Sequence, residues 1–302
     1  MEKVCVATQM SDARVAELKG KMLDDSHVKC TIENESTTVI TPEGNVLAVL
    51  IKHALPSTLC ATAEPFFLSA ATQNVIHSFR GTAAGEKMVR RPKKDGTFSK
   101  MLTVPDVPRL RGSKNGLLGY MDAGTNGLNP CRTTAYTRDH WEQFSTTVMP
   151  YVQAVDQVFQ MHMPERWAAQ NSVATTTPDY TIAGTAFSTI TVNLNFVTAT
   201  HQDKGDLPEG FGVLTCFRSG EYSGGSLVFP KYGLAMNVDT GDVLLADVHQ
   251  WHGNLPIIGT HGEYQRLSCV MYYRSRLPLC PHAAHSPQGR GNASPGHSPS
   301  AN

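Results

Sequence analysis

Two short segments of the sequence offer the ligands of a metal centre. His201 and Asp203 stand two positions apart in TATHQDKGD, at the end of a predicted strand. Residues i and i+2 of a strand point to the same face, so this imidazole and this carboxylate can reach one metal ion. Further along, GDVLLADVHQWHGNLP provides a second histidine, which is His249 or His252. We favour His252, in the turn after a strand predicted at 243–248, with His249 as its neighbour.

Two histidines and one carboxylate occupy one face of an octahedron and leave three coordination positions open. Non-haem iron(II) oxygenases use this arrangement to bind a keto-acid and then dioxygen. An HxD pair is common in unrelated proteins, so the prediction depends on further residues that would hold the keto-acid.

Arg266 and Ser268 are the candidates for that second task. They lie two positions apart in EYQRLSCVMYY, on the next predicted strand. An arginine buried in a β core needs a partner, because an isolated guanidinium there is costly. The planar guanidinium binds a carboxylate through two parallel hydrogen bonds. We therefore predict that Arg266 and Ser268 bind the distal carboxylate of 2-oxoglutarate.

The chain around these residues has a β pattern. From Thr181 onward, short segments rich in β-branched residues follow one another, separated by Gly, Pro, Asp and Asn turns. Many short strands without intervening helices are typical of a sandwich or jelly roll. We predict an α+β protein, in which a double-stranded β-helix (a cupin-like jelly roll) forms the core and N-terminal helices flank it.

The remaining segments predict the elements that support this core. Local patterns predict a helix over Ser11–Leu23 capped by Ser11, a hairpin turning at Pro42–Asn45, a helix near 57–80, and a helix from Thr137 to about Ala169 that Pro150 kinks or divides. The expected domains are a mixed α/β region at 1–116, the jelly roll with its supporting helices at 117–277, and a disordered Pro/Ser/Gly/His-rich tail at 278–302.

Basic residues far outnumber acidic ones between Arg80 and Lys114, and prolines and glycines are interspersed among them. Two interpretations stay open: a solvated loop, or a loop that binds phosphates. Lysine plus arginine equals aspartate plus glutamate in the whole chain, at 26 each. A local basic segment would therefore confine a polyanion to one face.

The composition, with 40% hydrophobic and 17% charged residues over 302 positions, is that of a globular protein. Seven scattered cysteines without a CxxC pair predict reduced thiols, not a disulfide framework or a structural zinc site. The N-terminus lacks the apolar core of a signal peptide, and no stretch approaches the roughly 18 apolar residues of a membrane span. We expect an intracellular protein, nuclear in a eukaryotic host and otherwise cytoplasmic.

With these residues in place, the chain resembles the TET/JBP family of iron(II)- and 2-oxoglutarate-dependent dioxygenases, which oxidise the 5-methyl group of pyrimidines in nucleic acids. The likeness is greatest to the JBP branch, the thymine dioxygenases. It covers roughly residues 117–276, through GTAFSTITVNLNF, THQDKGDLPEGFGVLTCF, YSGGSLVFPKYGLAMNVDTGDVLLADVHQWHGN and QRLSCVMYYR. The resemblance implies that His201, Asp203 and His252 bind Fe(II), that Arg266 binds 2-oxoglutarate, and that O2 is consumed.

The resemblance also implies a DNA partner whose target base is flipped into the pocket. Oxidation of thymine to 5-hydroxymethyluracil is favoured; the alternatives are 5-methylcytosine, a nucleoside, RNA or a protein side chain, and a non-catalytic binding module. Substrate contacts are expected from Asn193, Asn195, Lys204, Arg90, Arg91, Lys93 and Lys94. The sequence shows neither a separate DNA-binding module nor the cysteine-rich elements of TET proteins. We therefore expect the Arg80–Lys114 segment to bind nucleic acid.

Overall fold

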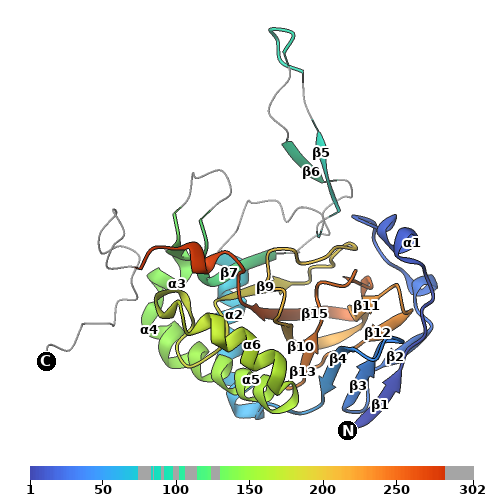
Figure 1. Cartoon of the computed structure of the whole chain (residues 1–302), viewed down its shortest axis with the longest axis horizontal. Coiled ribbons are helices and arrows are strands. Elements are labelled where there is room, and N and C mark those ends of the chain that lie inside the picture. Colours follow the sequence, from blue (N-terminus) through green and yellow to red (C-terminus); the bar gives the residue numbers. More distant parts are fainter. Residues whose placement is uncertain are drawn as a thin grey trace, which may run out of the picture.

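A computed structural model describes residues 1–73, 83, 85–89, 92–97, 102–105, 114–123 and 130–282 (Figure 1). Among these residues, a nine-stranded sheet forms the core, in the order β1-β3-β4-β13-β10-β15-β9-β7-β8. The strands are β1 (Glu2–Cys5), β3 (Thr37–Ile40), β4 (Val46–Ile51), β13 (Val243–Ala246), β10 (Gly212–Gly224), β15 (Ile257–Tyr272), β9 (Thr189–Leu194), β7 (Lys114–Met121) and β8 (Arg132–Thr133). All neighbours in this sheet are antiparallel except β1 and β3.

A smaller sheet of four strands has the order β14-β11-β12-β2. Its strands are β14 (Gly253–Asn254), β11 (Leu227–Phe229), β12 (Leu234–Met236) and β2 (Cys30–Ile32). The two sheets share an apolar layer that includes Leu50, Leu244 and Phe229. This pair of sheets, with helices beside it, confirms the predicted α+β jelly-roll core.

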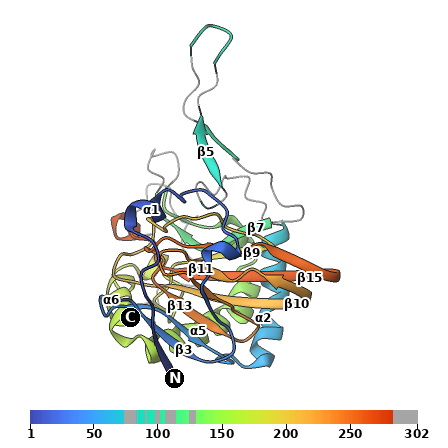
Figure 2. The same ribbon diagram turned by 90° about the vertical axis from the view of Figure 1, so that its right-hand side faces the viewer.

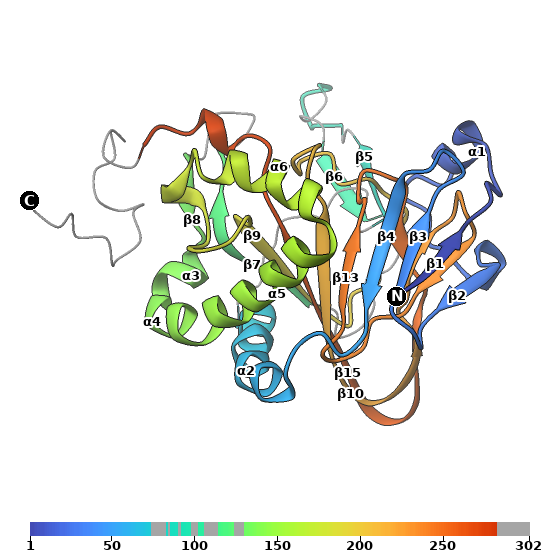
Figure 3. The ribbon, with the colours of Figure 1, turned by 60° about the horizontal axis from the view of Figure 1, so that its bottom comes forward.

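Helices pack on the other side of the large sheet (Figure 3). They are α2 (Ser57–Gln73), α3 (Ala135–Asp139), α4 (Trp141–Gln143), α5 (Met149–His162) and α6 (Pro164–Ala174). Phe67 of α2, Tyr151 of α5 and Phe217 of β10 form an aromatic triangle with ring centroids 5.5 to 5.7 Å apart. Because layers cover both faces, central strands such as β13 (VLLA) are apolar throughout instead of alternating.

The predicted helix over Ser11–Leu23 is shorter in the structure, where α1 covers Asp12–Ala16. Ser11 is its N-cap, as predicted, and its side chain accepts a hydrogen bond from the Arg14 backbone N–H. The helix cannot continue, because Gly20 has a φ of 74° and its N–H is bonded to the Thr200 carbonyl. The predicted hairpin at Pro42–Asn45 is confirmed by the antiparallel pair β3 and β4.

Pro150 does not divide the helical segment at its own position. It occupies the first turn of α5, where its missing N–H leaves no hydrogen bond unmade. A five-residue π-helical turn at Phe144–Val148 precedes α5. The division falls later, between α5 and α6, where Pro164 begins the second helix.

Strands from the predicted N-terminal region belong to the same large sheet as the jelly-roll strands. β4 pairs with β13, and β7 runs across position 116. The division at residue 116 stays a prediction.

Two further strands, β5 (Glu86–Val89) and β6 (Leu102–Pro105), form a hairpin that projects from the body (Figures 1 and 2). No helix in the described ranges is both long and apolar enough to cross a membrane.

The expectation that all cysteines are reduced is wrong for one pair. Cys131 and Cys280 form a disulfide between positions 149 apart in the sequence, with Cα atoms 5.9 Å from each other. No local spacing signals such a pair, because only the folded chain brings the segments together.

The predicted disordered tail also begins too early: Leu277–Leu279 form a 3-10 turn, and Tyr180 Oη donates a hydrogen bond to the Pro281 carbonyl. Residues 283–302 lie outside the described residues.

Candidate active site

His201 and His252 are joined to each other through their backbones. The N–H of each donates to the carbonyl of the other, at 2.8 and 3.0 Å, which makes an isolated antiparallel bridge. The two imidazoles are therefore neighbours, with ring centroids 4.3 Å apart. This bridge replaces the continuous strand that was expected to carry His201, since β9 ends at Leu194.

Asp203 completes a cluster with these two histidines. Its Oδ1 lies 3.4 Å from His201 Nε2, and its Oδ2 lies 3.6 Å from His252 Nε2. One ligand atom from each of the three residues fits within 4.8 Å of the others. The structure thus brings together the three residues that the sequence predicted as metal ligands.

The imidazoles are held in the tautomer that a metal requires. Nδ1 of His201 donates to the Ala199 carbonyl at 2.8 Å, and Nδ1 of His252 donates to the Gln250 carbonyl at 2.9 Å. Each Nε2 is then the ring nitrogen left to bind a metal ion, and it faces Asp203. The donor set of two imidazole nitrogens and one carboxylate fits Fe(II), and the side that faces the cavity leaves room for further ligands.

The cluster attracts positive charge. Partial burial acts to raise the pKa of Asp203, but the charges and hydrogen bonds of the two histidines outweigh it and hold that pKa well below its usual value. Burial and the neighbouring His252 lower the pKa of His201. Burial also acts most strongly to lower the pKa of His252, but the hydrogen bond and charge of Asp203, the Gln250 carbonyl and the charge of Asp247 together outweigh it and raise that pKa. A carboxylate that stays ionised between two imidazoles is the charge pattern of a cation site.

His249, the alternative third ligand, is used elsewhere. Its Nε2 contacts the Leu207 carbonyl at 3.1 Å, and its own carbonyl accepts a hydrogen bond from Gln202 Nε2 at 2.6 Å. It therefore braces the loop that follows Asp203. The metal-ligating cluster found in the described residues contains His252 and not His249.

Arg266 lies in the same cavity and is 3% exposed. Its Nη2 has no hydrogen-bond partner among the described residues. Gly225 makes room for the side chain: a Cβ at this glycine would stand 2.7 Å from Arg266 Cδ and Nε. A buried guanidinium atom without a partner is costly, so the site suits an anionic ligand. Ser268, also buried, lies two residues further along the same face of β15.

The cavity measures about 310 Å³ and lies between the two sheets. β9, β10, β13 and β15 of the large sheet and β11 and β14 of the small sheet contribute to its walls. From Arg266 onward, every second residue of β15 lines it, in the period of two that strands impose. These residues are Arg266, Ser268, Val270 and Tyr272, and the row continues to Arg274 just past the strand.

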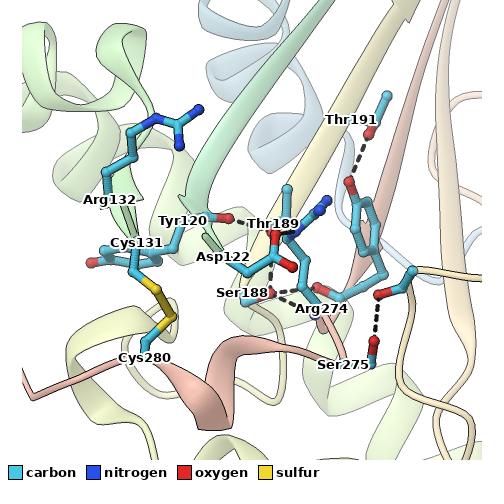
Figure 4. A network of polar contacts seen from close by, with 12 residues as sticks. Tyr120, Asp122, Cys131, Arg132, Ser188, Thr189, Thr191, Arg274, Ser275 and Cys280 are labelled. Atoms are coloured by element: carbon cyan, nitrogen blue, oxygen red, sulfur yellow. Dashed lines mark hydrogen bonds and ion pairs between the residues drawn. A yellow bond between two sulfur atoms is a disulfide. The ribbon is translucent and has the colours of Figure 1, made fainter. Parts of the chain in front are cut away.

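Tyr272 and Arg274 form a second polar group that the sequence analysis missed (Figure 4). Arg274 Nε donates to Asp122 Oδ1 at 2.6 Å, and the Arg274 backbone N–H donates to Ser188 Oγ at 3.0 Å. The Tyr272 hydroxyl is 3.2 Å from that of Thr191. Extending the alternation that links Arg266 to Ser268 would have identified both residues.

The remaining predicted substrate residues have different outcomes. Asn193 and Lys204 line the cavity. Asn195 does not: it has a left-handed φ of 47°, and its Oδ1 accepts a hydrogen bond from the Arg266 backbone N–H at 2.7 Å. Asn195 follows the last residue of β9, and its hydrogen bond ties the end of β9 to β15. Lys93 and Lys94 are exposed in the turn between β5 and β6. The predicted residues Arg90 and Arg91 lie outside the described residues.

Comparison with known proteins places this geometry in a family. The model of the Tet_JBP family, the oxygenase domain of the 2OGFeDO superfamily, matches residues 116–275. Thymine dioxygenase JBP1 of Trypanosoma brucei brucei is 33% identical over 82% of this chain and 26% of its own length. JBP1 of Crithidia fasciculata is 30% identical over 89% of this chain and 30% of its own length. The chain thus spans about a quarter of the length of the curated relatives it matches.

A solved structure titled NgTET1 in complex with 5mC DNA shares the fold, with a TM-score of 0.57, 15% identity, and coverage of 90% of this chain and 94% of that one. The family model implies an oxidoreductase that uses Fe(II), 2-oxoglutarate and O2, and the clustered His201, Asp203 and His252 agree with it. Because the family model matches more than half of the chain, at residues 116–275, the chain belongs to the Tet/JBP family of 2-oxoglutarate- and iron-dependent dioxygenases.

Proposed function

We propose that this domain hydroxylates the 5-methyl group of a pyrimidine base in DNA, with thymine as the preferred base. His201, Asp203 and His252 would hold Fe(II), and Arg266 with Ser268 would hold the distal carboxylate of 2-oxoglutarate. One observation carries the proposal. The three convergent donor atoms and the buried, partnerless Arg266 nitrogen share one cavity.

When bound, Fe(II) with 2-oxoglutarate and O2 supplies an oxidant that hydroxylates a C–H bond, while the keto-acid becomes succinate and carbon dioxide. The protein's own residues set the geometry. Arg266 orients the co-substrate by a charge-assisted, bidentate contact. Leu214, Val248 and Val270 line the cavity with apolar surface, which limits the water around the reacting groups.

The burial of the site supports a flipped base. His201 and His252 are 7% and 4% exposed, so a methyl group inside a duplex cannot approach them. A base rotated out of the stack can enter a cavity, as enzymes that modify bases require. A cavity of about 310 Å³ is within the range of small-molecule sites.

The Arg274 side chain supports thymine over 5-methylcytosine. A guanidinium offers only hydrogen-bond donors. Thymine presents a carbonyl oxygen at position 4, whereas cytosine presents an amino group there. A donor on the cavity wall therefore favours thymine, and Asp122 holds this donor in place. A second candidate function, oxidation of 5-methylcytosine, is favoured by the fold shared with NgTET1.

The exposed Lys93 and Lys94 support contact with DNA phosphates. Phosphate contacts release counterions, so DNA binding should weaken steeply as salt rises. Changing both lysines to glutamine should weaken binding and reduce its salt dependence. Lys3→Gln, an exposed change on β1 at the edge of the large sheet, is the control and should leave both unchanged.

The decisive experiment incubates the protein with Fe(II), 2-oxoglutarate and oligonucleotides that contain thymine or 5-methylcytosine, and measures the digested nucleosides by mass spectrometry. We expect 5-hydroxymethyluracil, and none with Asp203→Ala. Oxidation of 5-methylcytosine alone would replace the preferred substrate by the second candidate. Turnover of a nucleoside, RNA or peptide while DNA stays intact would overturn the DNA assignment.

Two further measurements sharpen this experiment. Arg274→Gln should lower the ratio of thymine to 5-methylcytosine oxidation by about 10-fold, the scale of one hydrogen bond to a charged group. Arg276→Gln, the same change outside the cavity, should leave the ratio unchanged. Anaerobic addition of Fe(II) and 2-oxoglutarate should produce a charge-transfer absorption band. Its absence would favour a non-catalytic binding module.

A further inference from the structure

Residues 20–23, here called the N-terminal clasp, lie against the segment that carries His201. The Gly20 N–H donates to the Thr200 carbonyl at 2.8 Å, and the Thr200 N–H donates to the Lys21 carbonyl at 2.9 Å. The Thr200 hydroxyl donates to the same Lys21 carbonyl at 3.0 Å. Both backbone groups of the residue before His201 are thus bonded to a segment 179 positions away.

The opposite edge of this segment pairs with the chain around His252. Besides the bridge between the two histidines, the Asn254 N–H donates to the Thr198 carbonyl at 3.0 Å. The segment 198–201 is therefore held by hydrogen bonds to the clasp through Thr200 and to the chain around His252 through Thr198 and His201. A shift of the clasp would therefore move Thr200 and, with it, the segment that carries His201.

Leu23 connects the clasp to the second histidine directly. It is 1% exposed and packs with Val228 and Ala235 of the small sheet. A Cβ on Gly253, the residue after His252, would stand 3.2 Å from Leu23 Cδ1 and 3.1 Å from the Thr198 carbonyl. The leucine side chain therefore fills the space that the glycine leaves open, immediately beside both histidine-bearing segments.

We propose that the N-terminal clasp is a positioning element of the metal centre and sets its metal affinity, an inference that rests on the proposed metal site. Two imidazoles and a carboxylate bind one ion tightly only when their supports hold them in the required geometry. The clasp contacts the chain next to both histidines, at Thr200 before His201 and at Gly253 after His252. It lies outside residues 116–275, which match the family's oxygenase domain. The centre of this chain would therefore depend on a segment that the domain match leaves out.

The test compares two leucine truncations in the full-length chain. Leu23→Ala opens a space at the clasp, while Leu47→Ala opens one in the layer between the sheets, away from the clasp, at a side chain that is equally buried. The readouts are the dissociation constant of Mn(II), used as a redox-inert probe of the iron site, and the unfolding temperature without metal. We expect Leu23→Ala to weaken Mn(II) binding about 10- to 100-fold, as loss of supporting groups does elsewhere. Leu47→Ala should lower the unfolding temperature and leave Mn(II) affinity unchanged.

Two more variants keep the test decisive. Thr200→Val preserves the shape of the side chain and removes its bond to Lys21, so it should weaken Mn(II) binding several-fold even if Leu23→Ala fails to fold. Leu23→Met conserves volume and should restore most of the affinity. Equal Mn(II) affinity in Leu23→Ala, Thr200→Val and the unaltered protein would overturn the clasp proposal alone. Failure of the unaltered protein to bind Mn(II) would overturn the metal site itself.

Discussion

The two faces of β15 differ in what they contribute. Leu267, Cys269, Met271 and Tyr273 point to the helix side and belong to the largest apolar cluster. Arg266, Ser268, Val270 and Tyr272 point to the cavity. Apolar burial on the helix side stabilises the fold. On the cavity side, the buried Arg266 Nη2 without a partner in the described structure costs stability until a ligand meets it. Adjacent residues of one strand thus have different roles, and substitutions on the two sides should have different effects.

The largest effect is expected at the metal cluster on the cavity side. His252→Ala should abolish Mn(II) or Fe(II) binding and all turnover, because it removes one of three convergent ligand atoms. His249→Ala removes an imidazole three positions away that contacts the Leu207 carbonyl instead, and should retain metal binding. Metal titration of both variants is the measurement. Loss of binding in His249→Ala with retention in His252→Ala would reverse the ligand assignment.

Phe67→Ala tests the helix side. Phe67 is fully buried against Tyr151 and Phe217, so its truncation should lower the free energy of unfolding by about 3–5 kcal/mol. Denaturant titration measures this loss. Turnover per folded molecule should be unchanged at a temperature where the variant is fully folded. A changed 2-oxoglutarate requirement in the folded variant would contradict the assignment of stability to the helix side and ligand binding to the cavity side of β15.

Arg266→Lys tests the anion site without removing its charge. Lysine cannot form the bidentate contact, so the requirement for 2-oxoglutarate should rise by about 10- to 100-fold, while Mn(II) affinity stays the same. Steady-state kinetics at varied 2-oxoglutarate provides the readout. An unaltered co-substrate requirement would remove Arg266 from its proposed role.

The smallest effect is expected from Ser268→Ala, next to Arg266 on the same face. The change removes one hydroxyl donor to the co-substrate carboxylate and keeps the charge of Arg266. A hydrogen bond to a charged group is worth at least about 1.5 kcal/mol, so the 2-oxoglutarate requirement should rise about 10-fold. Cys269→Ser, on the opposite face one residue further on, is the control. It should leave that requirement unchanged and reduce stability instead, because it places a hydroxyl in the apolar cluster. A larger kinetic effect of Cys269→Ser would contradict the comparison.

Local patterns in the sequence were sufficient to predict the strands after Thr181 and the cluster of His201, Asp203 and His252. The period of two along a strand also indicated that Arg266 and Ser268 share a face. The period of two along a strand does not fully explain how His201 and Asp203 are positioned, however. β9 stops at Asn195, whose left-handed backbone depends on contacts with β15, and a backbone bridge to His252 then aligns His201.

The features that the sequence did not reveal are contacts between distant positions. Asp122 meets Arg274 across 152 positions, and Thr200 meets Lys21 across 179. The period of two along β15 extends to Arg274 but does not say which distant residue it meets, because the pairing follows from the order of strands in the sheets. The same holds for the addition of β4 to β13, which was not expected from the proposed boundary at residue 116.

The Cys131–Cys280 disulfide turns the catalytic part of the chain into a closed ring. The ring contains the three clustered metal-ligand candidates, Arg266 and both faces of β15. A single proteolytic cut inside the ring would leave the two pieces tethered through the sulfur–sulfur bond. The metal-ligand candidates on either side of such a cut would thus stay in one covalently joined molecule for as long as that bond remains intact.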